Sequence, residues 1–414
     1  MAFQNYREIF REAPYRWFWS GFTFSMLGDA MTRVALTWFV YEATHSSEAL
    51  GWLMVCYTGP VIVGGLMAGS LLDRFDRRAV MIADSLIRGV TVALVPILHV
   101  TGHLALWHVY AVAAVYGLLM MISLAGVPSL IPALVPRERL STANALETLS
   151  YMIGGVAGPL IAGWLIPRLG APNVVMVDAL SYFVFAFALR QMRLTDPPHP
   201  ASAKEQQAHT MGDAARLLLT NPILFSTTFM YMAANIGAGF VSVFLPFLSD
   251  QWLGGGSQVY GLLLGAMSLG EVLSALAAGS ITFSLSLGTL ICAALALTGA
   301  SLGLLLIPLG LWTVLPGLFL FGAFSSPLTI WAQTLRMQII PERLRGRTFA
   351  LLRTLMQAGG PIGGGLAGVI LPVIGLPAMI ALSATMVGAP GIIGYQVEPL
   401  RAAGPGGSPE QTPP

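Results

Sequence analysis

Charged residues are scarce in this chain of 414 residues, because only 10% are Asp, Glu, Lys or Arg. An ordinary soluble domain carries about 25% of such residues. Cysteine is rarer still, with Cys56 and Cys292 alone, and both lie inside apolar runs. These shortages exclude a string of soluble domains and a framework of disulfides.

Recognisable sites for cofactors, metals and catalysis are also missing. No phosphate-binding loop of the G-x-x-x-x-G-K-[ST] type and no H-E-x-x-H or G-x-S-x-G motif occurs. His99, His103 and His108 fall near one turn, but no cysteine or carboxylate accompanies them, so we expect no metal site. We therefore expect neither an enzyme nor a cofactor, and no nucleic-acid partner.

Long apolar runs fill most of the chain, which is 55% hydrophobic with a mean hydropathy of +0.74. A bilayer core about 30 Å thick requires roughly 20 apolar residues per helix. Such runs occupy residues 17–41, 49–71, 79–99, 106–131, 146–167, 172–192, 221–248, 257–281, 286–308, 311–334, 349–371 and 375–396. The sequence therefore predicts an all-α integral membrane protein with twelve transmembrane helices.

The arginines lie on one side of this predicted topology. They fall in the N-terminal segment and in every second loop, including Arg336, Arg343, Arg345 and Arg347 in the tenth loop, whereas the opposite loops hold only Arg168. Cytosolic loops carry an excess of Lys and Arg. We therefore expect a multi-pass monomer in the bacterial cytoplasmic membrane with both termini in the cytosol.

The two halves of the chain resemble each other. At an offset of 205 residues, Gly154, Gly158 and Gly163 match Gly359, Gly363 and Gly368. A parallel repeat of six helices is a known transporter plan, with the substrate site between the halves. We predict two pseudo-symmetric bundles at residues 17–192 and 216–397, flanked and joined by a cytosolic segment at 1–16, a cytosolic linker at 193–215 and a disordered cytosolic tail at 398–414.

Half of the residues in the stretch GSLLDRFDRR (69–78) are charged. The stretch resembles the loop motif between helices 2 and 3 of the major facilitator superfamily, G-x-L-a-D-R-x-G-R-R/K. The matching residues are Gly69, Leu71, Asp73, Arg74, Arg77 and Arg78, while Asp76 replaces the usual glycine. The resemblance implies a cytosolic latch that holds the two halves together, to which we add Asp84 and Arg88. The alternative is a simple positive-inside anchor.

A second stretch, GGVAGPLIAG (154–163), is similar to a motif that the same family associates with antiporters. It includes Gly154, Gly158, Pro159 and Gly163. Small residues at helical spacing permit close packing, and proline bends a helix. Ordinary helix packing is the alternative. The fragments SMLGDAMTRVALTWFVY, LIPALVPRERLSTANALETLS and VVMVDALSYFVF further resemble the drug-exporter branch that includes macrolide and enterobactin exporters.

Four charged residues within the apolar runs are candidates for proton coupling. A charge near the bilayer midplane costs about 3 kcal/mol, so it needs a partner or a use. Asp29 and Arg33 lie four residues apart in the first run and are expected to pair, either as a proton site or as a static contact. Glu271 lies well inside its run, whereas Asp178 is expected close to the outer surface.

The substrate cavity is expected to carry aromatic side chains, which suit varied hydrophobic shapes. The candidates are Phe229, Tyr231, Asn235, Phe321, Phe324 and Trp331, with lipid-facing or packing roles as the alternative. Together with the resemblance, these features predict a secondary active exporter of amphipathic molecules such as drugs or siderophores, working by alternating access and proton antiport. A lipid or lysophospholipid transporter remains the alternative, and a membrane-embedded enzyme or a sensor is disfavoured.

Overall fold

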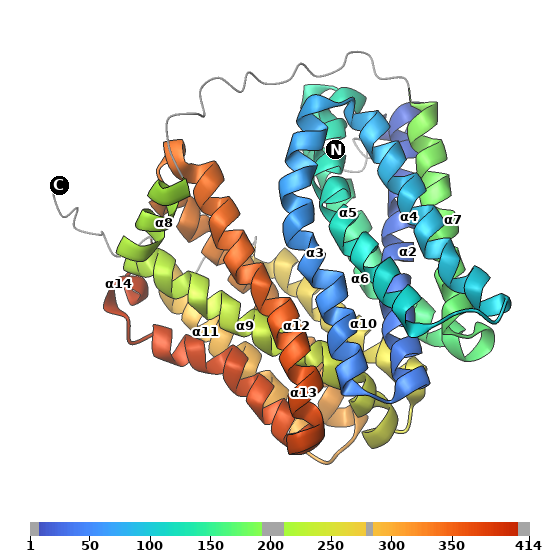
Figure 1. Cartoon of the computed structure of the whole chain (residues 1–414). Helices are drawn as coiled ribbons and strands as arrows, with labels where there is room; N and C mark the ends of the chain where they lie inside the picture. The colour runs from blue at the N-terminus through green and yellow to red at the C-terminus, as the bar shows by residue number, and fades with distance from the viewer. Residues whose placement is uncertain (1–7, 193–210, 279–284, 405–414) are drawn as a thin grey trace. The chain divides into compact units, whose positions relative to one another are not determined.

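The computed structural model describes residues 8–192, 211–278 and 285–404, and within these ranges the chain is almost entirely helical. It divides into two compact units. The first unit holds α2 to α7 and the segment Gly255–Gly265, in which α10 begins. The second unit holds α8, α9, the rest of α10 and α11 to α14 (Figure 1).

The helices of the first unit are long enough to cross a bilayer. They are α2 (Ala13–Thr44), α3 (Ser47–Arg74), α4 (Arg77–Val100), α5 (Leu106–Leu134), α6 (Leu140–Leu169) and α7 (Ala171–Gln191), with a 3-10 turn, η1 (Arg137–Arg139), before α6. In this unit α2 packs against α6 and α7, α3 against α5, and α4 against α5 and α7. Helices far apart in sequence are therefore neighbours.

The second unit begins with a short helix and continues with longer ones. It contains α8 (Met211–Thr220), α9 (Pro222–Phe247), η3 (Leu248–Trp252), most of α10 (Gly256–Ala278), α11 (Leu287–Leu302), η4 (Gly303–Leu306), α12 (Leu311–Ile339), η5 (Glu342–Leu344), α13 (Arg345–Gly394) and α14 (Glu398–Arg401). Here α13 packs against α9 and α11, and α11 packs against α12.

Ten of the described helices have the length and composition to cross a membrane. One of them, α13, joins the last two predicted spans across a break at Gly375, where φ is 76° and ψ is 168°. A positive φ of this kind favours glycine. The helix α2, outside those ten, covers the predicted first span. The described helices thus match the twelve predicted runs.

Two predicted boundaries differ from the structure. The linker was expected to extend to residue 215, but α8 begins at Met211, and residues 193–210 lie outside the described ranges. The tail was expected to be disordered from residue 398, but α14 lies there. Leu400 is fully buried, and the Ala403 carbonyl accepts a hydrogen bond from the Gly288 amide at 3.0 Å. Residues 405–414 lie outside the described part of the chain.

The same glycine contact occurs once in each unit, which supports the predicted repeat. A Cβ atom added at Gly154 of α6 would lie 2.6 Å from the Met26 carbonyl oxygen of α2. A Cβ atom added at Gly359 of α13 would lie 2.4 Å from the Met232 carbonyl oxygen of α9. Only glycine permits backbones to approach this closely, so each unit joins two of its helices through backbone contact.

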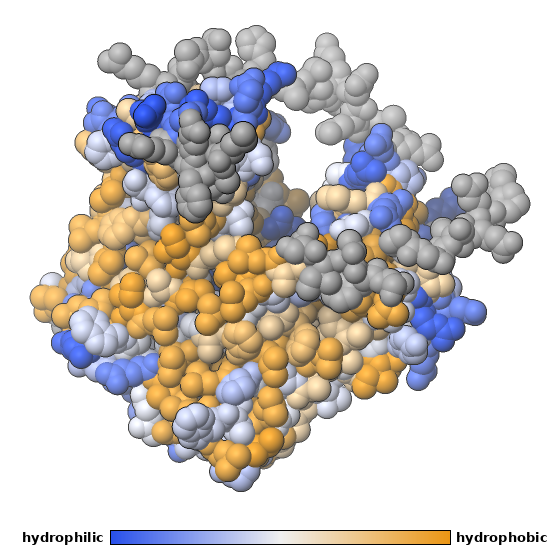
Figure 2. Space-filling view, turned by 180° about the vertical axis from the view of Figure 1, so that it is seen from behind, coloured by the Kyte–Doolittle hydropathy of each residue, from blue (hydrophilic) through white to orange (hydrophobic). Residues whose placement is uncertain are grey.

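Large hydrophobic side chains cover much of the molecular surface, as Figure 2 shows in orange on one face. Val100 is 78% exposed and Trp312 is 87% exposed. A soluble protein rarely exposes large continuous apolar patches. The surface therefore fits a chain whose helices are surrounded by lipid.

Candidate functional site

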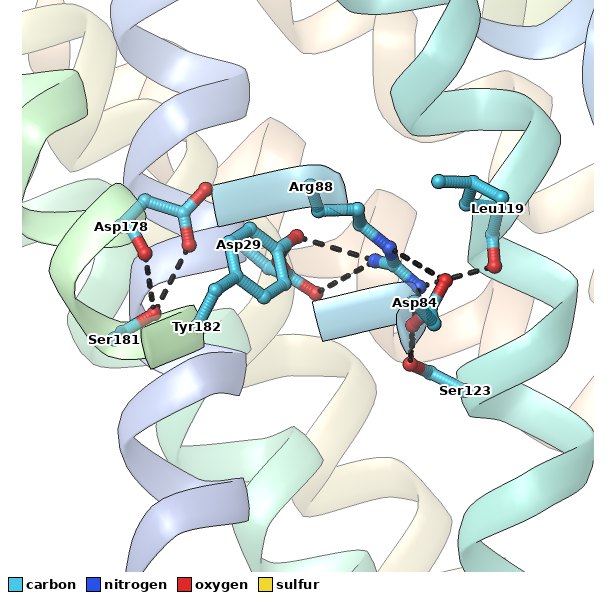
Figure 3. Close-up of polar contacts among 8 residues, drawn as sticks. All are labelled: Asp29, Asp84, Arg88, Leu119, Ser123, Asp178, Ser181 and Tyr182. Atoms are coloured by element: carbon cyan, nitrogen blue, oxygen red, sulfur yellow. Dashed lines mark hydrogen bonds and ion pairs between the residues drawn. The ribbon is translucent and has the colours of Figure 1, made fainter. Parts of the chain in front are cut away.

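A buried cluster of charged and hydroxyl side chains lies inside the first unit, and Arg88 of α4 is at its centre (Figure 3). Arg88 binds Asp84, one helical turn earlier, through two hydrogen bonds: Nε to Oδ1 at 3.2 Å and Nη2 to Oδ2 at 3.0 Å. Nη2 also donates to the Leu119 carbonyl at 3.0 Å and to the Ser123 hydroxyl at 2.9 Å on α5. Ser123 in turn donates to Asp84 at 2.9 Å.

The other side of Arg88 faces α2 and α7. Its Nη1 atom donates to the Tyr182 hydroxyl at 3.1 Å and lies 4.0 Å from Asp29 Oδ2. The Tyr182 hydroxyl donates to Asp29 Oδ1. The Arg88 Cζ atom lies 5.5 Å from the ring centre of Tyr116 and 5.3 Å from that of Tyr182, within the range of a cation–π contact. One guanidinium therefore connects four helices.

The two acids around Arg88 are held differently. The Asp84 side chain is 1% exposed and pairs closely with the guanidinium. The Asp29 side chain is 13% exposed. Its Oδ2 atom lies 4.0 Å from Arg88 Nη1, whereas Asp84 Oδ2 lies 3.0 Å from Arg88 Nη2. Asp84 is thus the close, buried counterion of Arg88, while Asp29 is the more loosely held and more accessible carboxylate.

A third acid, Asp178 of α7, is fully buried beside this cluster. Its Oδ1 atom accepts a hydrogen bond from Ser181 at 3.1 Å, and its Oδ2 atom makes no hydrogen bond within the described part of the chain. Gly28 leaves room for it, because a Cβ atom at Gly28 would lie 2.5 Å from Asp178 Oδ1. Asp178 is therefore buried against α2 beside Gly28.

The structure also changes the expected partners of the other charged residues. Asp29 was expected to pair with Arg33; Arg33 does act on it electrostatically, and in addition Asp29 contacts Arg88 on another helix. Asp84 and Arg88 were assigned to the cytosolic latch, but they lie buried about halfway along α4. Spacing within one helix reveals only neighbours on that helix. The need of every intramembrane charge for a partner was the one available signal for the contact between helices.

The charged turn between α3 and α4 is held by contacts within the first unit. Asp76 begins α4 as its N-cap, because its Oδ1 accepts a hydrogen bond from the Ala79 amide at 2.8 Å. Arg77 Nη1 donates to the Ser129 carbonyl at 3.4 Å. Arg78 donates from Nε to the Leu189 carbonyl at 2.8 Å, at the end of α7. Gly69, Asp73 and Arg74 are exposed at the same end.

The predicted antiporter motif lies along α6 and packs on two sides. Gly158 lies against α2, because a Cβ atom added to it would be 2.5 Å from the Ala30 Cβ atom. Gly163 lies against the beginning of α10, with Gly261 as its neighbour: a Cβ atom there would be 3.0 Å from Gly261 Cα. Pro159 is buried between these contacts.

The remaining candidates belong to the second unit. Glu271 is partly buried on α10, and its backbone carbonyl accepts a hydrogen bond from Ser274 at 3.1 Å. Asn235 of α9 donates to the Met356 carbonyl of α13 at 2.8 Å. Phe229 is 38% exposed beside Phe225, with ring centres 4.5 Å apart. Phe321 is buried, while Phe324, Trp331 and Tyr231 are partly buried.

Sequence reasoning missed Tyr182 and Ser123, which are uncharged members of the cluster.

No group of three or more His, Cys, Asp or Glu side chains suited to a metal ion occurs in the described ranges. His108, one of the three clustered histidines, accepts a hydrogen bond from the Ala105 amide at 3.0 Å through Nδ1 and so caps α5. The cluster is thus built for charge pairing and hydrogen bonding.

Known proteins of similar sequence are transporters. The "Multidrug efflux pump Tap" of Mycolicibacterium fortuitum is 27% identical over 376 residues, which cover 87% of this chain and 90% of that protein. The "Enterobactin exporter EntS" of Salmonella choleraesuis is 26% identical over 355 residues, which cover 84% of each. An "Uncharacterized MFS-type transporter y4rN" of Sinorhizobium fredii is 26% identical, also over 355 residues, covering 84% of this chain and 86% of that one.

The fold is also similar to that of a solved transporter. A crystal structure of a variant of the nucleoside transporter NupG superposes with a TM-score of 0.71, covering 95% of this chain and 99% of that one at 12% identity. The sequence profile of the Major Facilitator Superfamily matches residues 18–364. With the repeated helices, the charged turn and these matches taken together, the chain belongs to the Major Facilitator Superfamily and is a multi-pass membrane transporter.

Proposed function

We propose that the chain exports amphipathic or hydrophobic organic molecules by alternating access, with an inward flow of protons as the driving force. The similarity to a drug efflux pump and a siderophore exporter supports the export of such molecules. The one-sided arginines support a cytosolic location for both termini and, by analogy with these relatives, a place in the bacterial cytoplasmic membrane.

The single observation that carries proton coupling is the unequal attachment of Asp29 and Asp84 to Arg88. Asp84 makes a two-bonded pair with the guanidinium and is almost fully buried. Asp29 is joined to Arg88 only by a 4.0 Å ion pair, and its hydrogen bonds come from the tyrosines Tyr182 and Tyr116. A carboxylate that is loosely held and partly accessible can exchange a proton without leaving the arginine uncompensated.

Protonation of Asp29 would alter the contacts between helices. A neutral Asp29 loses its attraction to Arg88 and no longer requires the Tyr182 hydroxyl as a donor, while Asp84 still neutralises the arginine. The link of α2 to α4 and α7 then weakens, and its return requires proton release. This cycle gives the proton a structural effect on the first unit, which is what coupling to transport requires.

The driving force is large enough for the proposed task. Moving one proton across 100 mV releases about 2.3 kcal/mol. A tenfold concentration ratio requires about 1.4 kcal/mol, so one proton per neutral substrate sustains a ratio of roughly 40 from voltage alone. No hydrolysis of ATP is needed.

The test uses the purified full-length chain in liposomes, with fluorescent amphipathic dyes of positive, neutral and negative charge. We expect dye transport to follow an imposed pH gradient and Asp29→Asn to abolish that dependence. Glu42→Gln is the matched control, because Glu42 is an exposed acid on the same helix. Transport that ignores the gradient, or a D29N variant with full gradient-driven transport, would refute the coupling. Movement of labelled lipid without any dye would instead favour a lipid transporter.

A further inference from the structure

Arg336 is a buried cation in the second unit, remote in sequence from the cluster around Arg88. We expected it in a cytosolic loop, because the apolar run ends at residue 334. The structure places it in the last turn of α12, which continues to Ile339, and only 4% of the residue is exposed. A charge removed from water in this way requires compensation from its surroundings.

The surroundings of Arg336 compensate its charge only in part. Its Nη2 atom donates to the Thr227 carbonyl of α9 at 3.4 Å, a long hydrogen bond. Its Cζ atom lies 4.8 Å from the ring centre of Tyr231, also on α9, so the tyrosine covers one face of the guanidinium. Among the described residues, no carboxylate oxygen lies within 4.0 Å of it.

Arg88 shows what a compensated arginine looks like in the same protein. Its Nε and Nη2 atoms, which form one edge of the guanidinium, both bind Asp84. The corresponding edge of Arg336 has no such partner: Nε is buried without any acceptor, and Nη2 has only the long contact to Thr227. The Arg336 edge therefore offers two parallel N–H groups that the described chain leaves almost unused.

A second polar group beside Arg336 also lacks a partner. The Tyr231 hydroxyl is buried and makes no hydrogen bond of good geometry in the described part of the chain, where the Thr329 side chain of α12 is its polar neighbour. Two buried donors on facing helices thus remain unsatisfied at one place. Buried polar groups without partners are uncommon in proteins, and a bound ion is one of the ways in which such a set is completed.

The Nε and Nη2 edge of the Arg336 guanidinium is best matched by one class of ligand. Two parallel N–H groups match the two oxygens of a carboxylate in a bidentate pair, the strongest arrangement that an arginine makes. One guanidinium neutralises one negative charge, so a dianion such as a phosphate monoester would leave a net charge buried. The Tyr231 ring already covers one face, which leaves the edge as the available position.

We propose that Arg336 and Tyr231 form a binding site for the carboxylate of a monoanionic amphipathic substrate. The proposal rests on the transport function proposed above and narrows its substrates to molecules that include organic acids. Arg336 is buried in the described conformation, so binding requires α9 and α12 to separate at this end.

The test compares two probes of almost equal shape, pyrenebutyrate and its uncharged amide, pyrenebutyramide. Binding is measured by pyrene fluorescence on the full-length chain in phosphatidylcholine nanodiscs, without a pH gradient. We expect the wild type to bind the acid at least tenfold more tightly than the amide. We expect Arg336→Gln to bind both equally, and Arg336→Lys to keep only part of the preference because lysine has no two-pronged edge.

Arg345→Gln is the matched control, since Arg345 is 44% exposed and already pairs with Glu342 at 3.2 Å. It should keep the preference of the wild type. Thermal unfolding of each variant shows whether it is folded; should Arg336→Gln fail to fold, Arg336→Lys and Tyr231→Phe carry the comparison. Equal binding of acid and amide by the wild type, or no binding of either, would overturn the proposal.

Two further arms distinguish a substrate site at Arg336 from a lipid-binding site and from the proton site at Asp29. If nanodiscs containing phosphatidylglycerol abolish the acid preference, a lipid headgroup occupies the site and the proposed substrate is wrong. Asp29→Asn should leave the preference intact, because binding requires no gradient. If the wild type prefers the acid but shows no gradient-driven transport, the coupling proposal is wrong and the Arg336 site stands. If the wild type shows gradient-driven transport but no acid preference, the Arg336 site is wrong and the coupling proposal stands.

Discussion

Tyr182 of α7 donates a hydrogen bond to the carboxylate of Asp29 on α2, although 153 positions separate them in the chain. The same hydroxyl accepts a hydrogen bond from Arg88 at 3.1 Å. One uncharged oxygen therefore lies between an acid and a base and takes part in both contacts. Its position makes the tyrosine the simplest place to test whether the cluster acts as a unit.

The first prediction concerns this hydroxyl. Tyr182→Phe removes one hydrogen-bond donor of Asp29 and the acceptor of the Arg88 Nη1 atom, and the loss of such buried contacts costs about 1–3 kcal/mol. We expect a lower unfolding temperature and at least a tenfold lower rate of gradient-driven efflux. Tyr110→Phe is the matched control, because Tyr110 also loses one hydrogen bond, at 3.0 Å to the Ala49 carbonyl, but lies outside the cluster. Equal efflux by the two variants would count against a role of Tyr182 in coupling.

The second prediction concerns the pair of Arg88 and Asp84. Arg88→Met leaves Asp84 buried without its counterion, and breaking a buried pair from one side costs about 3–5 kcal/mol. The double variant Arg88→Met with Asp84→Leu removes both charges, so we expect it to be more stable than Arg88→Met alone. Thermal unfolding of the singles and the double in nanodiscs gives the coupling energy. Additive losses would show that the two residues stabilise the fold independently.

The third prediction tests the glycine contacts of α6 and α13. Gly158→Ala forces a Cβ atom to 2.5 Å from the Ala30 Cβ atom, and such overpacking costs about 1–3 kcal/mol. Ala30→Gly in the same chain should restore part of the loss. Gly363→Ala has no comparable rescue, because its Cβ atom would lie 2.2 Å from the backbone oxygen of Ile236. The unfolding temperatures of these three variants test the prediction. An unfolding temperature of Gly363→Ala equal to that of the wild type would contradict the described packing.

The fourth prediction separates two roles of Asp76. Asp76 is the N-cap of α4, so its replacement by Ala should lower the free energy of unfolding of the protein by about 0.5–2 kcal/mol. Replacement by Gly should lower it by only about a few tenths of a kcal/mol. Glycine is the residue that the family motif has there. We therefore expect Asp76→Gly to unfold close to the wild type and to transport normally, with Asp76→Asn as a control that keeps the cap. A transport defect in a stable Asp76→Gly would show that this carboxylate also takes part in the conformational cycle.

Sequence alone predicts the helices well because each span leaves a local signal. The predicted run at 311–334 corresponds to α12, Leu311–Ile339, and the run at 106–131 to α5, Leu106–Leu134. The underestimate at the end of α12 has a physical cause: Arg336 and Gln338 are polar, so hydropathy ends the run before the helix ends. That underestimate is also why Arg336 was assigned to a loop.

The partners of the buried charges were not predictable from sequence in the same way. Helical periodicity identified Arg33 as a neighbour of Asp29 and Arg88 as a neighbour of Asp84, since each pair is four residues apart. The contact from Asp29 to Arg88 depends on how α2 and α4 pack, which periodicity does not specify. By contrast, Asp76 could have been recognised as a cap from its place just before a helix.

The paired glycine contacts, Gly154 with Met26 and Gly359 with Met232, bear on how this chain can evolve. Each joins two helices through a main-chain oxygen, an atom that no side-chain substitution on the opposite helix removes. These two contacts therefore survive any replacement of a side chain on α2 or α9 that leaves the backbone in place.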